Sequence, residues 1–195
     1  MPHKVFFCRP SGKSRVKLSS YREGKCESGD FHSASIEVFY GPTEEAEKVY
    51  RDRSIGLGPE KCERCGFVFS EMDRSGCSIG ATYVRDDTGE EFGHLSKAPI
   101  GACWDATWYS DGRRRGPDGR YLIVATPGGH WAIDSRASNC TMKDDDVHYC
   151  WVRHGCPEDG TLHVDKNGNT CQAGAGSIMC GSYHGFLHNG YLTDN

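Results

Sequence analysis

The segment Cys62-Glu-Arg-Cys65-Gly-Phe67 constrains this chain most, because two cysteines in such a turn present both sulfurs to one metal ion. A tetrahedral site needs two further ligands, and Cys26 and His32 lie in a polar, glycine-containing segment that can supply them. The sequence therefore predicts a structural zinc ion held by Cys26, His32, Cys62 and Cys65. Four protein ligands leave no open position for a reacting water.

Other interpretations of these cysteines are open. Cys77, Cys8 and His94 are alternative ligands for the same ion. Cys62 and Cys65 could instead form a redox-active pair, or remain two thiols without a metal.

A second group of cysteines and histidines lies between residues 140 and 188. His148 and Cys150 are two residues apart, a spacing that places both side chains on one face of a strand. Cysteine is also among the most buried residue types, so simple core packing is the alternative. If a second metal binds here, the predicted ligands are Cys140, Cys150, Cys171 and His184.

The loop that follows the strand predicted near residues 130–134 suggests an enzyme, because polar residues on loops of a rigid scaffold often form active sites. In this hypothesis Cys140 is the nucleophile, with His148 or His184 as its base. Asp134 or Asn139 would orient the base, and Arg136 would bind a carboxylate or phosphate. The alternative is a structural turn in which Arg136 pairs with Asp134. The predicted catalytic residues are Cys140, His184, Asp134 and Arg136.

The apolar pattern predicts an α+β fold that is mostly β, with short antiparallel strands, one main helix and a zinc-knuckle element. Proline and glycine turns around an apolar run predict a β-hairpin over residues 120–135. Pro42 and three following glutamates predict a helix that ends near Arg53, and Asn167-Gly168 predicts a tight turn. We expect a single domain over residues 1–195. Within it, residues 20–80 would form the zinc-knuckle region and residues 98–195 a β-rich, Cys/His-rich region.

Composition narrows the possible partners. The chain has 195 residues and a formal net charge of -4, which provides no basic field to attract nucleic acid. The start has no apolar run of signal-peptide length, and no stretch approaches membrane-spanning length. We therefore expect no nucleic-acid or membrane partner. The 11 cysteines are expected to be reduced thiols and metal ligands, or a disulfide framework if the protein works outside a cell.

Four segments carry a resemblance to known sequences: residues 131–141, 148–155, 174–178 and 183–187. They resemble hypothetical proteins encoded by tailed bacteriophages, especially phages of actinobacteria, and the similarity extends more loosely back to the 62–67 knuckle. Cys180-x3-His184 followed by Asn189-Gly190 is also similar to a bacterial zinc-ribbon-like family of ubiquitin-like conjugation operons, for which a peptidase role has been suggested. The spacing here departs from that family by one residue.

The resemblance implies expression in the cytoplasm of an infected bacterium. The leading hypothesis is a zinc-stabilised phage accessory protein that modulates a host or phage complex through protein interaction. One alternative is a small peptidase-like hydrolase that uses the 134–140 loop with Cys140 and His184. Another is a minor virion component.

Overall fold

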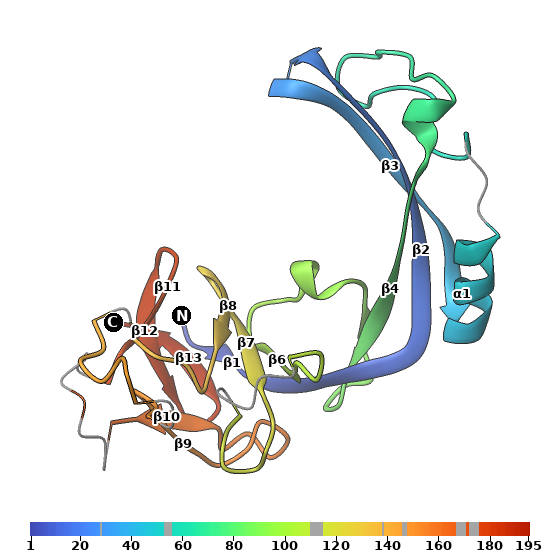
Figure 1. The fold of residues 1–195 in the computed structure, drawn as a ribbon. Coiled ribbons are helices and arrows are strands. Elements are labelled where there is room, and N and C mark those ends of the chain that lie inside the picture. Colours follow the sequence, from blue (N-terminus) through green and yellow to red (C-terminus); the bar gives the residue numbers. More distant parts are fainter. Residues whose placement is uncertain are drawn as a thin grey trace. The chain divides into compact units, whose positions relative to one another are not determined.

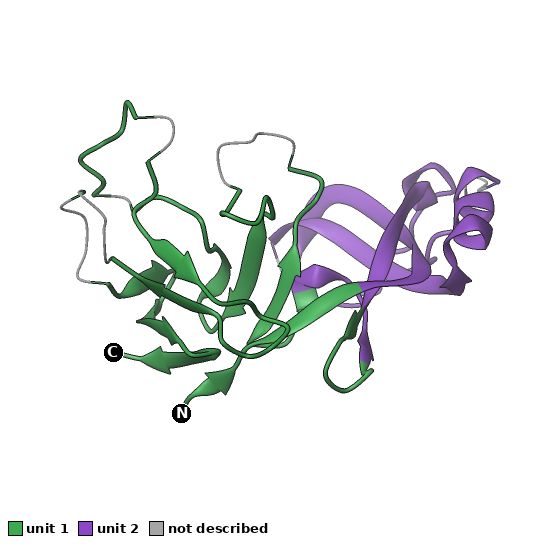
Figure 2. Cartoon of the chain, turned by 90° about the horizontal axis from the view of Figure 1, so that it is seen from below, with its two compact units in different colours: residues 1–9, 84–90, 97–195 green, residues 10–83, 91–96 purple. Residues whose placement is uncertain are grey.

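The computed structural model describes the chain in eight stretches: residues 1–27, 29–52, 56–109, 115–137, 139–145, 148–166, 171 and 176–195. It forms two compact units, coloured separately in Figure 2. Unit 1 consists of residues 1–9, 84–90 and 97–195, and unit 2 of residues 10–83 and 91–96. The predicted region 98–195 falls within unit 1 and the region 20–80 within unit 2. The single-domain organisation stays a prediction.

Unit 2 is built on a long antiparallel hairpin (Figure 1). Its strands are β2 (Phe6–Cys26), whose first residues belong to unit 1, β3 (Gly29–Pro42), β4 (Gly76–Arg85), which ends in unit 1, and β5 (Glu91–Phe92). β2 pairs with β3 on one side and with β4 on the other, and β5 continues beyond β4. Two 3-10 helices, η1 (Met72–Arg74) and η2 (Leu95–Lys97), lie in the connections.

The hairpin strands are much longer than the short strands predicted for this part of the chain. Along β2, Ser14, Val16, Leu18 and Ser20 are buried and alternate with half-buried polar residues. This is the period of two expected for a strand. Because two of the four buried residues are serines, the buried face has few apolar side chains to reveal it in the sequence.

The predicted helix is confirmed as α1 (Thr43–Arg51), which follows β3 directly (Figure 1). Glu44 and Glu45 occupy its first turn, where negative charge is favourable, and Lys48 and Arg51 lie in its last turn. Ala46 is fully buried, so the helix turns one small side chain inward while its charged residues stay at the surface.

Unit 1 contains an antiparallel sheet and two smaller groups of strands. The four-stranded sheet has the order β1 (His3–Lys4), β13 (Tyr191–Asp194), β12 (Tyr183–His188) and β11 (Ile178–Cys180). A separate hairpin joins β9 (Val152–His154) to β10 (His163–Asp165). The remaining strands are β6 (Ala102–Asp105), β7 (Leu122–Thr126) and β8 (Gly129–Ala132). β6 runs parallel to β2 at Phe6 and Phe7 and antiparallel to β7.

The predicted hairpin over 120–135 is confirmed as β7 and β8. All five residues of β7 are buried, as expected for a central strand covered on both faces. The predicted turn at Asn167-Gly168 lies outside the described residues. In the described part of the chain, no helix has the length and apolar character needed to cross a membrane.

The core of unit 1 gathers residues from most of its strands. Trp131 and Trp151 meet edge to face, with ring centroids 6.0 Å apart. Three cysteines, Cys140, Cys150 and Cys171, belong to this apolar core. The fold thus places one of the two sets of candidate metal ligands inside the core itself.

Candidate metal centres

The 62–67 segment folds into the tight turn that its sequence predicts. The Cys62 N–H donates to the Phe67 carbonyl at 2.9 Å, and the Gly66 N–H donates to the Cys62 carbonyl at 3.0 Å. Gly66 has a φ of 72°, a left-handed conformation that glycine adopts without steric cost. The turn is closed by a bridge between Lys61 and Val68.

The structure brings all four predicted ligands of the first site together, and we call Cys26, His32, Cys62 and Cys65 the knuckle group. One ligand atom of each lies within 4.8 Å of the others. The Cys26 sulfur is 3.9 Å from that of Cys62 and 3.6 Å from that of Cys65. Two sulfurs bound to one tetrahedral zinc are separated by about 3.8 Å, whereas a disulfide bond is about 2.05 Å long. The spacing therefore suits ligands of one ion.

Each ligand of the knuckle group comes from a defined element. Cys26 ends β2, His32 lies in β3 across the hairpin, and Cys62 and Cys65 come from the turn. His32 Nδ1 is 3.2 Å from the Cys65 sulfur. The His32 ring also stacks on Phe67, with centroids 4.1 Å apart and planes 9° apart, so the aromatic residue of the motif orients the imidazole. The alternative ligands Cys77, Cys8 and His94 are also described by the structure, but they are not part of the knuckle group.

One thiol of the knuckle group, that of Cys62, has a lowered pKa that favours cation binding. Main-chain N–H groups of Cys65 and Arg64 donate toward the Cys62 sulfur and lower the pKa of that thiol to about 6. A thiolate is the form that binds metal. Cys62 therefore ionises more readily than an ordinary cysteine, which favours its binding to a metal ion.

A second group of four possible ligands lies in unit 1, and we call Cys140, His148, Cys150 and Cys171 the core group. Their ligand atoms also lie within 4.8 Å of one another. The Cys171 sulfur is 3.6 Å from that of Cys140 and 3.9 Å from that of Cys150. His148 Nε2 is 3.7 Å from the Cys150 sulfur. Both Cys3His groups could hold a metal ion.

The core group corrects one predicted ligand. Cys140, Cys150 and Cys171 were predicted together with His184, but the fourth member is His148. His184 lies on β12, and its Nε2 is 2.9 Å from Ser177 Oγ. The two-residue spacing of His148 and Cys150 is the sequence signal that could have placed His148 in this group.

Arg136 holds the loop that carries His148. Its guanidinium donates to main-chain carbonyls of His148 at 3.1 Å, Met142 at 3.3 Å and Lys143 at 2.8 Å, and also to that of Asp145. The charged guanidinium thus holds the backbone at residues 142–145 and at His148. This role differs from the predicted binding of a carboxylate or phosphate by Arg136.

The other predicted catalytic residues have separate partners. Asp134 is 5% exposed and pairs with Arg153 at 3.2 Å, so it does not pair with Arg136. Burial raises the pKa of Asp134 to about 6 in spite of that arginine. Cys140 is 4% exposed and belongs to the core group. This environment favours a ligand role for Cys140 over that of a nucleophile, which stays a prediction.

The two groups differ in the state of their thiols. Burial raises the pKa of Cys150 to about 11, whereas Cys62 has a pKa of about 6 and its neighbour Cys65 is exposed. Without metal, we expect iodoacetamide at pH 7 to modify Cys65, the exposed cysteine of the knuckle group, well before the three buried core-group cysteines. Peptide mass mapping over time measures this order, and zinc should protect both groups. Cys77 is the control, because its labelling should not depend on metal; equal rates for both groups would contradict the assignment.

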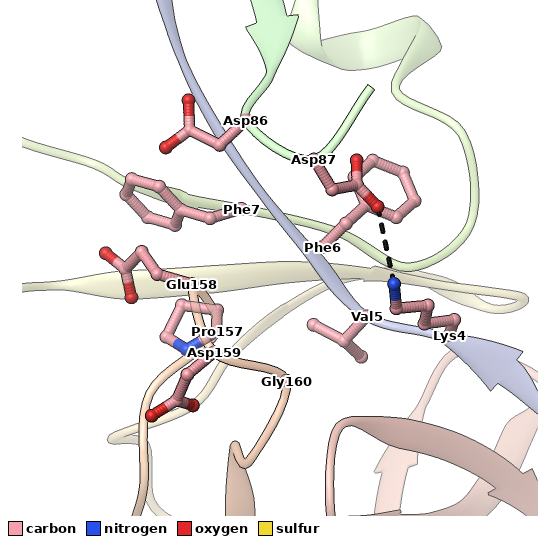
Figure 3. A pocket seen from close by; sticks show the side chains of 10 residues that line it. All are labelled: Lys4, Val5, Phe6, Phe7, Asp86, Asp87, Pro157, Glu158, Asp159 and Gly160. Atoms are coloured by element: carbon pink, nitrogen blue, oxygen red, sulfur yellow. Dashed lines mark ion pairs between the residues drawn. The ribbon is translucent and has the colours of Figure 1, made fainter. Parts of the chain in front are cut away.

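Unit 1 also has an acidic cavity of about 180 Å³, shown in Figure 3. Its carboxylates already have partners: Lys4 pairs with Asp87 at 3.5 Å, and Arg9 with Asp86 at 2.5 Å. Glu158 pairs with Arg120, and Asp159 accepts from Thr161. These compensated charges make the cavity less suited to a metal ion than the two thiol groups.

Comparison with protein-family models, curated proteins and solved structures finds no match to this chain. The resemblance to phage proteins therefore stays a prediction. The geometry of the two Cys3His groups is the feature of this chain that bears most directly on its function.

Proposed function

We propose that the protein is a zinc-stabilised interaction protein that modulates a host or phage complex. The convergence of four ligands in the knuckle group carries this proposal. Thiolate and imidazole ligands in a compact set favour zinc over harder cations such as magnesium. A zinc with four protein ligands has no position for a substrate, so its role is structural.

The knuckle group supports an interaction role because of where it lies. It joins the 62–67 turn to the end of the β2–β3 hairpin, next to large exposed side chains. Tyr21 is 53% exposed and Phe31 43% exposed, and their rings are 5.6 Å apart across the two strands. Aromatic residues of this kind are the usual anchors of protein interfaces. A metal that orders this end of the hairpin would present them to a partner in one conformation.

The proposal is tested by recovering the partner from infected cells with a tagged full chain. We expect one protein of the host or phage to co-purify in stoichiometric amount. The double variant Tyr21→Ala, Phe31→Ala should lose it, because truncating central anchors typically costs about 2 kcal/mol or more each. Tyr191→Ala is the matched control, since Tyr191 is 45% exposed on unit 1 and should not affect recovery. No partner, or equal recovery with both variants, would contradict the proposal.

The alternative proposal is that the protein is a minor component of the virion. It predicts that the chain sediments with purified particles. Its absence from particles, together with a partner in the lysate, would favour the accessory role.

A further inference from the structure

Unit 1 has a second cavity, of about 630 Å³. None of the eight candidate metal ligands is among the described residues that line it. Apolar side chains of Trp131, Trp151 and Met179 line part of it. Ser177 and His184 contribute polar atoms to the same cavity. The size is in the range of pockets that hold small molecules, and the lining combines apolar side chains with the polar residues Ser135, Arg136 and Asn139.

Ser177 and His184 form a close pair at this cavity. His184 Nε2 is 2.9 Å from Ser177 Oγ, a distance suited to transfer of the serine proton. On the other side of the ring, His184 Nδ1 is 3.4 Å from the side-chain amide of Asn195. When the Asn195 amide turns by about 180°, its oxygen faces His184 Nδ1 and can accept the proton there. Nε2 is then free to act as a base.

The sheet holds the three residues in place. His184 lies opposite Met179 in the β11–β12 ladder, and Ser177 directly precedes β11. The Asn195 N–H donates to the His184 carbonyl at 3.1 Å, which fixes the residue after β13 beside the histidine. His184 is in a strand, and Ser177 and Asn195 are each next to the end of a neighbouring strand, so the sheet restricts the positions of all three.

We propose that Ser177, His184 and Asn195 form a serine acyl-transfer site that hydrolyses small esters with an apolar acyl group. Ser177 Oγ forms a bond to the ester carbonyl carbon while its proton moves to His184 Nε2. The carbon–oxygen bond to the alcohol then breaks, and His184 gives the proton to the departing alkoxide. Water then gives a proton to His184 Nε2 as its oxygen bonds to the acyl carbon. The bond from that carbon to Ser177 Oγ breaks, His184 returns the proton to Oγ, and the acid leaves. The residues act as nucleophile, general base and positioning residue respectively.

The lining of the cavity selects the substrate class. Trp131, Trp151 and Met179 offer an apolar surface for the acyl chain. Asn139 also lines the cavity, and a side-chain amide is a suitable donor for the oxyanion of the tetrahedral intermediate. This activity goes beyond the proposed interaction role and does not depend on it. It also differs from the predicted hydrolase, because its nucleophile is Ser177 and not Cys140.

A fluorophosphonate probe and the ester p-nitrophenyl butyrate test the proposal on the full chain with its metal bound. We expect the wild type to be labelled and to hydrolyse the ester. Ser177→Ala should abolish labelling, and His184→Gln should lower kcat about 100-fold or more. Ser182→Ala is the matched control, since Ser182 is an exposed serine of the same unit that does not line the cavity. Its labelling and kcat should equal those of the wild type.

The positioning role of Asn195 is tested by measuring kcat and KM separately. Asn195→Ala should lower kcat with little change in KM, and Asn195→Asp should restore most of the rate. No labelling of a wild type that is folded and metal-loaded would overturn the proposal, as would equal labelling of Ser177→Ala. Circular dichroism and metal content check that each variant is folded. They also separate this result from the interaction proposal, which is tested by partner recovery alone.

Discussion

Replacing Cys62 with serine is expected to remove one metal ion per chain and to lower the melting temperature of the protein by about 10 °C or more. The apolar cluster beside the knuckle is small: Ala34, Cys62 and Phe69 are buried, and Cys26 packs against them. So small a cluster buries little apolar surface and contributes little hydrophobic stabilisation to this end of the unit. The bound ion would supply most of the stabilisation, since a structural zinc contributes about 10 kcal/mol or more in small domains.

Metal content by elemental analysis and thermal unfolding by circular dichroism measure this effect. Cys77→Ser is the matched control, because Cys77 is a half-buried cysteine of the same unit outside the knuckle group. It should keep both the metal and the melting temperature. If Cys62→Ser retains the full metal content, the knuckle group is not a metal site.

The second large effect is expected in the core group, where Cys150→Ala should remove the other metal ion and destabilise unit 1. Cys150 is fully buried, and its sulfur is one of three that lie close together in the core. Loss of one ligand leaves the remaining thiols without the ion that would hold them. We expect a loss of several kcal/mol, beyond the roughly 1 kcal/mol typical of a point substitution.

Cys103→Ala provides a close comparison, because Cys103 is equally buried in the same apolar core and is not one of the four core-group ligands. It should cost only about 1 kcal/mol and leave the metal content unchanged. Denaturant unfolding with parallel metal analysis compares the two variants. Equal destabilisation with unchanged metal would mean that Cys150 is a packing residue only.

Local patterns in the sequence predicted the features that depend on neighbouring residues. Cys62 and Cys65 lie in one turn, so their spacing alone indicated a shared ligand site. The helix over Thr43–Arg51 followed from Pro42 and the glutamates after it, and the β7–β8 hairpin from the turn residues around an apolar run. These features need only a few adjacent backbone conformations, which short-range steric and electrostatic rules determine.

Partners that come from distant segments were harder to predict. His148 and not His184 lies with Cys140 and Cys171 in the core group, and Arg136 donates to the carbonyls of Lys143 and His148 beside it. Asp134 pairs with Arg153 across the fold, although Arg136 is nearer in sequence. The length of β2 was hidden because part of its buried face is serine.

The sequence by itself determined the chemistry that is available to this protein, namely two concentrations of cysteine and histidine in a mostly β chain. Only the tertiary structure decided which of these residues meet, and it also brought Ser177, His184 and Asn195 together beside the neighbouring strands β11, β12 and β13. The physical reason is that a turn positions neighbours through local backbone geometry. Ligands from separate strands meet only after the sheets and the core have formed.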